Sequence, residues 1–260
     1  MAKIYSILSG KGGVGKTTST INLGAALNLL GKSVIIVDAN LSTPNIGLHL
    51  GAPLVPVTLN HVLDGRADLA DAIYEHSSGL KILPSSLSIK ELKKINHNNL
   101  QNIIKELKNL ADHIFLDSSA GLGREAQSSI SAGDEIILIT QAEMPSVTDA
   151  LKAAKLAEHL NKDVKGVIIT RHRKSKIEMP IENIQDMLEL PILGIIPEDK
   201  NVQKSLYLKD AVLHTHPKSK ASRAYKEIAE RLLGSQYAKK QEEKEKQNRY
   251  SRILKKLGFR

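Results

Sequence analysis

The chain has 260 residues, a formal net charge of +9 and 41% hydrophobic residues, which is the composition of a globular protein rather than a disordered or fibrous one. It has no cysteine, which excludes structural disulfides, thiolate nucleophiles and cysteine-ligated metal centres. Aromatic residues make up only 3%, so the core must be mainly aliphatic, as in a sheet covered by helices. The longest stretch without Lys, Arg, Asp or Glu, residues 39–63, contains three prolines, and no signal-peptide pattern is visible, so we expect neither a membrane-spanning helix nor export.

Strand-forming and helix-forming segments alternate along the first 235 residues. Short aliphatic runs predict seven strands, at residues 3–8, 33–37, 80–83, 113–116, 135–140, 164–170 and 192–196. Longer segments with helical periodicity predict six helices, at residues 16–30, 89–110, 124–132, 147–160, 181–188 and 218–233. Between the second and third strands, residues 59–63 and 69–74 predict two short helices. The alternation predicts an α/β fold with a mostly parallel, twisted sheet flanked by helices.

A glycine-rich stretch joins the first predicted strand to the first predicted helix. From Gly10 to Thr17 it fits the P-loop pattern of Gly, four residues, Gly, Lys and Thr. The backbone N–H groups of such a loop converge on phosphate oxygens, Lys16 can reach the β and γ phosphates, and Thr17 can bind Mg²⁺. We therefore expect ATP and Mg²⁺ as cofactors. The expected nucleotide contacts in this stretch are Gly10, Lys11, Gly12, Gly13, Val14, Gly15, Lys16, Thr17 and Thr18.

One lysine of this stretch, Lys11, is not required by the general P-loop pattern. With it, the segment Gly-Lys-Gly-Gly-Val-Gly-Lys-Thr-Thr resembles the deviant Walker A motif of the MinD/ParA family of P-loop ATPases, and the chain is most similar to the MinD members. In that family, the lysine matching Lys11 reaches across a nucleotide-sandwiched dimer to the partner's phosphates. The resemblance implies an ATP-dependent homodimer in which Lys11 and Lys16 are catalytic residues.

Two aspartates, Asp38 and Asp117, follow predicted strands, where open α/β sheets bind their ligands. Asp117 fits the Walker B position that holds the hydration shell of Mg²⁺, and Asp38 fits the acid that orients the attacking water, so both join Thr17 as candidate metal-site residues. Each aspartate could instead cap a helix or a turn. MinD-like sequences usually carry a second acid two residues after the position of Asp38, whereas this chain has Asn40. We therefore expect an ATPase that is slow without a partner.

The resemblance extends over most of the first 235 residues. Residues 132–150 are similar to the strand, loop and helix that follow the second switch region of the family, and residues 166–171 and 196–199 resemble the segments that flank the adenine. The resemblance therefore implies base contacts, with a purely structural role at strand ends as the alternative. The residues in question are Thr170, Arg171, Pro197 and Asp199.

Basic residues are concentrated at the end of the chain. Residues 238–260 hold nine Lys or Arg and three Glu, which leaves a net charge of only +3 for residues 1–237. We expect a P-loop ATPase domain at residues 1–235, a charged linker at 236–247 and a basic amphipathic helix at 248–260. This helix resembles the membrane-targeting sequence of MinD and would lie on anionic lipid. Its expected membrane contacts are Tyr250, Arg252, Ile253, Leu254, Lys255, Lys256 and Leu257.

These expectations describe a cytoplasmic ATPase that attaches peripherally to the inner face of the cell membrane as an ATP-bound dimer and leaves it after hydrolysis. As in MinD, it would act as a spatial switch in positioning the division site, together with an unidentified activator or effector protein. The tail could instead dock on its own domain, remain solvated or bind nucleic acid. Two other functions stay open: a ParA-like partition ATPase, which would need basic residues on the globular domain to bind DNA, and a small-molecule ligase or kinase on the same fold, which would need an acceptor pocket.

Overall fold

The computed structural model describes residues 2–92 and 99–234, which form an eight-stranded sheet with the order β3-β4-β2-β5-β1-β6-β7-β8. Every neighbouring pair is parallel except β3 and β4. The strands are β1 (Lys3–Leu8), β2 (Val34–Ala39), β3 (Tyr74–Glu75), β4 (Lys81–Leu83), β5 (His113–Ser118), β6 (Glu135–Gln141), β7 (Val164–His172) and β8 (Ile192–Pro197).

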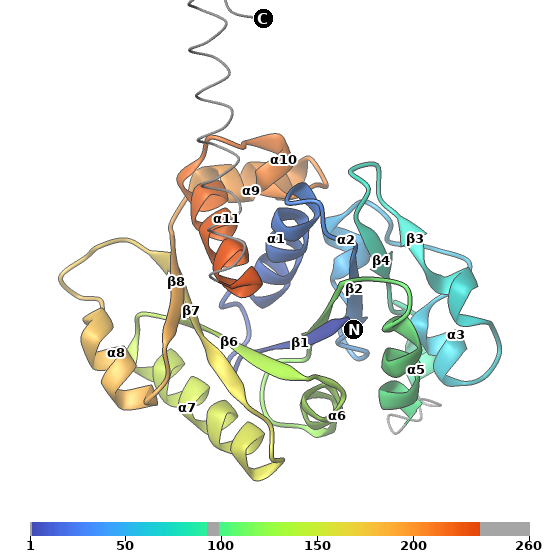
Figure 1. Ribbon diagram of the computed structural model, residues 1–260, viewed down its shortest axis with the longest axis horizontal. Helices are drawn as coiled ribbons and strands as arrows, with labels where there is room; N and C mark the ends of the chain where they lie inside the picture. Colours follow the sequence, from blue (N-terminus) through green and yellow to red (C-terminus); the bar gives the residue numbers. More distant parts are fainter. Residues whose placement is uncertain (1, 93–98, 235–260) are drawn as a thin grey trace, which may run out of the picture.

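Helices cover both faces of this sheet (Figure 1). Helices α1, α10 and α11 share one hydrophobic cluster on one face, while α6, α7 and α8 pack on the other, where α5 and α3 cover the β2–β4 side. The helices are α1 (Lys16–Leu29), α2 (Ile46–His49), α3 (Leu59–Leu63), α4 (Ile89–Leu92), α5 (Leu100–Leu107), α6 (Arg124–Ala132), α7 (Met144–His159), α8 (Ile181–Leu188), α9 (Lys200–Tyr207), α10 (Val212–Thr215) and α11 (Lys220–Leu233), with a 3₁₀ turn η1 at Leu69–Ala72.

The central strands are continuous apolar runs because both of their faces are covered. All six residues of β2 and all six of β5 are buried. Each of these two strands nevertheless carries an aspartate near its carboxyl end. Those polar positions therefore stand out within the core, at the edge of the sheet where the P-loop lies.

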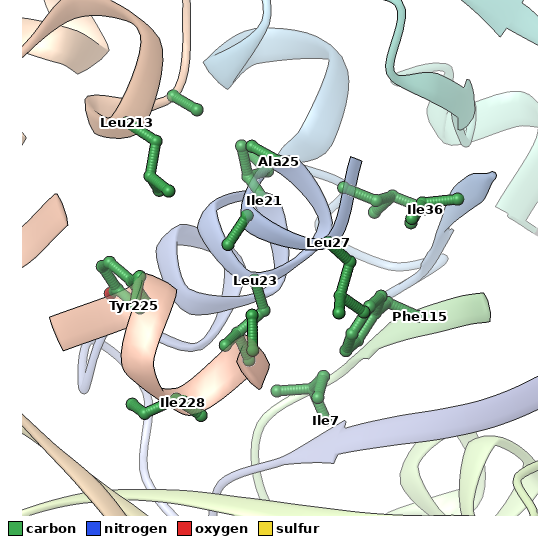
Figure 2. Close-up of a cluster of buried hydrophobic side chains, with 14 of the residues drawn as sticks. Ile7, Ile21, Leu23, Ala25, Leu27, Ile36, Phe115, Leu213, Tyr225 and Ile228 are labelled. Atoms are coloured by element: carbon green, nitrogen blue, oxygen red, sulfur yellow. The ribbon is translucent and has the colours of Figure 1, made fainter. Parts of the chain in front are cut away.

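Helix α1 is enclosed on almost every side (Figure 2). Its aliphatic residues, among them Leu23 and Leu27, contact the sheet through Ile7 and Phe115 and contact α11 through residues such as Tyr225. Gly24 lets the helix approach β2 closely, since a Cβ atom there would lie 2.8 Å from the Cδ1 atom of Ile36. This packing holds the start of α1, and with it the P-loop, in a defined position relative to the strands.

The structure confirms the predicted α/β class and the mostly parallel sheet, but it corrects two segments. The residues predicted as a helix at 69–74 form only the 3₁₀ turn η1, and Tyr74 enters β3, where its main chain pairs with β4. The predicted helix at 89–110 is described at its two ends as α4 and α5, and α5 stops at Leu107 because the next turn tightens to i→i+3 hydrogen bonds. Helices α2, α9 and α10, which are four to eight residues long, were not predicted from the sequence.

No helix in residues 2–92 or 99–234 is long and apolar enough to cross a bilayer. The predicted linker at 236–247 and the predicted basic helix at 248–260 lie outside the described residues. Their assignment therefore remains a prediction from the sequence.

Candidate nucleotide-binding site

The P-loop joins the end of β1 to the first turn of α1. Gly13 and Gly15 have φ angles of 79° and 91°, values that glycine adopts at little cost and other residues rarely reach. Gly15 is the N-cap of α1, no side chain caps this end, and the first turn holds no acidic residue. The free backbone N–H groups and the positive end of the helix dipole therefore face the loop, as phosphate binding requires.

Asp117, at the end of β5, accepts hydrogen bonds from three side chains of α1. Its Oδ1 accepts a 2.9 Å hydrogen bond from Nζ of Lys16, and its Oδ2 accepts a 2.5 Å hydrogen bond from Oγ1 of Thr17. Thr20, one turn further along α1, donates to Oδ1 at 3.2 Å. Asp117 is fully buried and Lys16 is 8% exposed, so the ion pair is shielded from solvent. Two P-loop residues and the aspartate at the predicted Walker B position thus form one network.

Asp38 lies beside Asp117, at the end of β2. Its Oδ2 accepts hydrogen bonds of 2.9 Å from the backbone N–H groups of Asn45 and Ile46, whereas its Oδ1 is buried and has no partner among the described residues. Burial and the nearby charge of Asp117 raise the pKa of Asp38, although the two N–H donors and Lys16 act in the opposite direction. A carboxyl group with a raised pKa and a free oxygen is suited to accept or share a proton.

The donor set fits Mg²⁺, which prefers oxygen ligands in an octahedral arrangement with several waters. The hydroxyl of Thr17 and the carboxylate of Asp117 are adjacent, and the unpartnered Oδ1 of Asp38 is a third oxygen at the same edge of the sheet. No group of three or more His, Cys, Asp or Glu side chains in the described ranges forms a metal site by itself. The ion would therefore depend on phosphate and water oxygens for its remaining ligands.

A cavity of about 420 Å³ opens over this network. Most of the P-loop lines this cavity, and so does Arg171, near the end of β7. Some of its other lining residues were not predicted from the sequence. Three of these residues follow β2, namely Thr43 and Asn45 in the loop and His49 in α2. Because they come soon after the carboxyl end of a parallel strand, where such sheets bind ligands, their place near the site could have been predicted. Leu206 comes from α9, and no local pattern in the sequence marks it. The lining residues are Ser9, Gly12, Gly13, Gly15, Lys16, Thr17, Thr18, Asn40, Thr43, Asn45, His49, Ala120, Arg171 and Leu206.

Burial lowers the pKa of His49, which favours a neutral imidazole at the cavity wall. Asn40, the position where MinD-like sequences usually carry an acid, forms a turn instead. Its Nδ2 donates to the carbonyl of Thr43 at 2.6 Å, and its Oδ1 accepts from the Thr43 hydroxyl at 3.1 Å. This turn shapes the loop that delivers Asn45 to Asp38.

The other predicted P-loop residues lie around the cavity rather than on its wall. Lys11 is exposed and makes no hydrogen bond or ion pair with any residue that the structure describes. Val14 is buried and its carbonyl accepts a 2.6 Å hydrogen bond from Thr170. Gly10 packs against α7, where a Cβ atom would lie 2.1 Å from the carbonyl oxygen of Asp149.

The four candidate base contacts fall into two groups. Arg171 lines the cavity, while the hydroxyl of Thr170 holds the main chain of the P-loop and of β6. Pro197 ends β8, and the carboxylate of Asp199 accepts hydrogen bonds from the backbone N–H groups of Asn201 and Ala221, where α9 and α11 begin. Against the effect of desolvation, these donors hold the pKa of Asp199 below its usual value. The structure thus brings Arg171 to the cavity and gives Thr170 and Asp199 main-chain partners.

A mostly parallel sheet, a P-loop and an uncapped helix N-terminus beside a buried aspartate together form the arrangement of a P-loop nucleotide-binding protein. The family model described as the CobQ/CobB/MinD/ParA nucleotide binding domain matches residues 5–210. The chain therefore belongs to the CobQ/CobB/MinD/ParA family, and its relatives include MinD proteins.

Three similarities cover nearly the whole chain. An ATP-binding protein of Methanocaldococcus jannaschii is 36% identical over 99% of this chain and 97% of its own length. The structure of the septum site-determining protein MinD from Pyrococcus horikoshii, complexed with Mg-ADP, is similar with a TM-score of 0.87 and 36% identity, over 91% of this chain and 99% of that one. MinD in a MinC:MinD cell division protein complex from Aquifex aeolicus has a TM-score of 0.82 and 32% identity, over 90% of this chain and 96% of that one.

Proposed function

We propose that the chain is an ATP-hydrolysing, membrane-associated switch of the MinD type. ATP binding would favour a homodimer, the dimer would attach to the anionic inner face of the cell membrane, and hydrolysis to ADP and phosphate would release it. The protein would be cytoplasmic, would bind peripherally to the inner face of the cell membrane, and would help to position the division site.

One observation carries the ATPase part: Lys16, Thr17 and Asp117 form a single network, in which Lys16 and Asp117 are buried, at an uncapped helix N-terminus. Asp117 already accepts a hydrogen bond from the Nζ group of Lys16. Phosphate oxygens arriving at the P-loop offer the same lysine a second set of acceptors, and Mg²⁺ held by Thr17 and Asp117 would neutralise phosphate charge. The MinD relative that is described with Mg-ADP supports this assignment of cofactors.

Hydrolysis needs a water molecule placed in line with the bond between the β and γ phosphates. We assign the orientation of this water to Asp38, because its Oδ1 is free of protein partners in the described ranges while its Oδ2 is held by two backbone N–H groups. The water would give its proton to solvent or phosphate as the P–O bond to ADP breaks. With Asn40 in place of a second acid, turnover would be slow until a partner protein completes or orders the site.

Dimerisation is assigned to Lys11. Its ammonium group is exposed beside the cavity and has no partner among the residues that the structure describes, so it is free to reach phosphates bound by another subunit. The complex of MinC and MinD from Aquifex aeolicus supports an effector protein as a further partner.

Membrane attachment is assigned to the predicted helix at 248–260. Three aliphatic side chains and a few cations give one such helix only weak affinity, whereas two helices on one dimer gain avidity of about 10²-fold or more. The tail would therefore make membrane binding depend on ATP. DNA is not expected as a partner, since the net charge of residues 1–237 is only +3.

Co-sedimentation with anionic vesicles tests the proposal. The full chain and a variant ending at residue 235 would each be measured with a non-hydrolysable ATP analogue and with ADP. We expect binding by the full chain with the analogue, at least tenfold weaker binding with ADP, and none by the shortened variant. Equal binding by the two chains would contradict the role of the tail, and retention of the full chain on duplex DNA instead of vesicles would favour the partition ATPase.

A further inference from the structure

A short basic loop follows β7, at the same edge of the sheet as the nucleotide site. It comprises residues 173–177, with the sequence Arg-Lys-Ser-Lys-Ile, and all five residues are exposed. Arg173, Lys174 and Lys176 carry three positive charges within four positions. Arg173 contacts Glu198 at 3.7 Å, whereas the side chains of Lys174 and Lys176 make no ion pair within residues 2–92 and 99–234. The loop therefore presents cations to solvent rather than to the protein.

The conformation of this basic loop is held from within. Both carboxylate oxygens of Glu178 accept the backbone N–H of Arg173, at 2.9 and 3.1 Å, and one of them also accepts the N–H of Ser175 at 3.0 Å. Lys174 has a φ angle of 58°, in the left-handed region that a lysine seldom occupies. A non-glycine residue in this region is retained only where surrounding contacts specify it. The loop therefore has a defined conformation, held by the hydrogen bonds to Glu178.

The tip of the loop is apolar. Ile177 is 95% exposed, more than any other large hydrophobic residue in the described ranges. Two residues later, the backbone N–H of Met179 donates to the carbonyl of Ala142 at 2.9 Å, which places the loop beside the start of α7. Met144, the first residue of α7, is itself 58% exposed. Two exposed apolar side chains, Ile177 and Met144, therefore lie close to the cations of the loop. Glu143, just before α7, is an exposed acidic residue in the same region.

We propose that the basic loop is a second membrane contact, in which Ile177 enters the headgroup region of an anionic bilayer and Lys174 and Lys176 lie against lipid phosphates. On nucleic acid, this loop could use its cations on phosphates, but it has no aromatic ring on which a base could stack. An apolar residue preceded by lysines suits a lipid surface instead, where the apolar side chain enters the bilayer and the cations lie at the headgroup phosphates. Each cation near such a surface strengthens binding by about fivefold.

This inference rests on the membrane attachment proposed above and adds a contact on the folded domain itself. The described residues end at Gly234, just after α11, and Arg231 of this helix donates to the carbonyl of Leu193 near the start of β8, at the opposite edge of the sheet from the basic loop. The distance between the two edges of the sheet is about 30 Å, the length of the nine residues of β7. Residues 236–247 are long enough to cover this distance, because twelve residues can span at most about 40 Å when extended. Tail and loop can therefore reach one surface, and two contacts would set the orientation of the domain.

A tryptophan at the loop tip provides a direct test, because the chain contains none. In the full chain, Ile177→Trp would be mixed with anionic vesicles and a non-hydrolysable ATP analogue. We expect a blue shift of its emission and protection from an aqueous quencher. Leu54→Trp, at a position that is 85% exposed, is the matched control and should stay solvent-like. An unshifted emission spectrum of the Ile177→Trp variant, on vesicles that do sediment the protein, would overturn the inference.

Charge variants separate this inference from the proposed function. The full chain with Lys174→Gln, Lys176→Gln and Ile177→Ser should bind vesicles at least fivefold more weakly, with unchanged ATP turnover in the absence of lipid. The control carries Lys152→Gln and Lys155→Gln, two exposed lysines of α7. Equal vesicle binding by the loop variant and the unmodified chain would refute the loop contact alone, whereas failure of the unmodified chain to bind would refute the membrane proposal as well. Loss of duplex DNA retention without loss of vesicle binding would assign the loop to nucleic acid.

Discussion

Asp38 and Asp117 are register partners on the neighbouring parallel strands β2 and β5, and both are fully buried. Lys16 neutralises Asp117, and two backbone N–H groups hold one oxygen of Asp38. Two carboxylates therefore share one lysine in a region screened from water. Such an arrangement is costly in the absence of a ligand, because like charges repel strongly at low dielectric and each charge loses its hydration.

The first prediction concerns Asp38→Asn in the nucleotide-free protein. The raised pKa of Asp38 means that the folded state retains a proton which the unfolded state has released, so the stability of the unmodified protein should fall as the pH rises from about 4 towards 8. The asparagine variant lacks this effect and should be more stable at pH 7.5, by about 1–3 kcal/mol. Urea denaturation across this pH range measures the difference.

The same variant should lose ATP hydrolysis, since an amide cannot replace the carboxylate that orients water. The stability gain should disappear below about pH 3, where the carboxyl group is protonated in both states. A gain that is independent of pH, or a loss of stability at pH 7.5, would contradict the assignment of repulsion and burial as the cause.

The second prediction compares two glycines of the P-loop. Gly10→Ala places a methyl group 2.1 Å from the carbonyl oxygen of Asp149 on α7, and main-chain atoms on both sides must move to admit it. Gly12→Ala meets no atom within 4 Å, and Gly12 does not have a positive φ angle. We expect Gly10→Ala to lower the free energy of unfolding by about 2 kcal/mol or more and Gly12→Ala by less than about 1 kcal/mol. Thermal denaturation of both variants without nucleotide would reveal similar losses if this packing were unimportant.

The third prediction concerns Lys11→Ala. Since the lysine has no partner among the described residues, the variant should keep the stability and the ATP affinity of the unmodified chain within about twofold. Dimerisation with a non-hydrolysable analogue should weaken at least tenfold, which corresponds to about 1.4 kcal/mol. Sedimentation velocity and nucleotide titration measure the two properties. Lys16→Ala is the contrasting variant and should lose both, because it also leaves buried Asp117 unpaired. Full dimerisation of Lys11→Ala would remove this lysine from the interface.

The fourth prediction concerns Asn40→Asp, which introduces the acid that MinD-like sequences usually carry at this position. The turn should largely survive, because Asn45 also donates to the carbonyl of Thr43, at 2.7 Å. We expect the steady-state ATPase rate to rise several-fold as a second carboxylate joins Asp38 near the attacking water. Asn40→Ala removes the turn without adding a charge and serves as control. An unchanged rate in Asn40→Asp, together with an unchanged rate in Asp38→Ala, would show that neither position governs hydrolysis.

Much of the site follows from patterns that span only a few residues. The P-loop spacing identified Lys16 and Thr17, and the position of Asp117 after an apolar run placed it at the carboxyl edge of the sheet. Predictions failed where the sequence pattern covers few residues or fits a helix and a strand equally well. Tyr74 suits a strand as well as a helix, and only pairing with β4 selected the strand. Leu206 reaches the cavity because the helices after β8 fold back over α1, which no local pattern encodes.

The sequence by itself determined the class of fold, the phosphate-binding loop and the chemical type of each polar group near it, because helix and strand periodicity and the conformational freedom of glycine act between neighbours in the chain. The tertiary structure alone decided that β2 and β5 lie side by side, that Asp38 keeps one oxygen unpartnered within the described residues beside Asp117, and that Ile177 stands exposed on a loop held by Glu178. These features depend on which distant segments become neighbours and on how much water they exclude, and both quantities are set only when the whole sheet and its covering helices have packed.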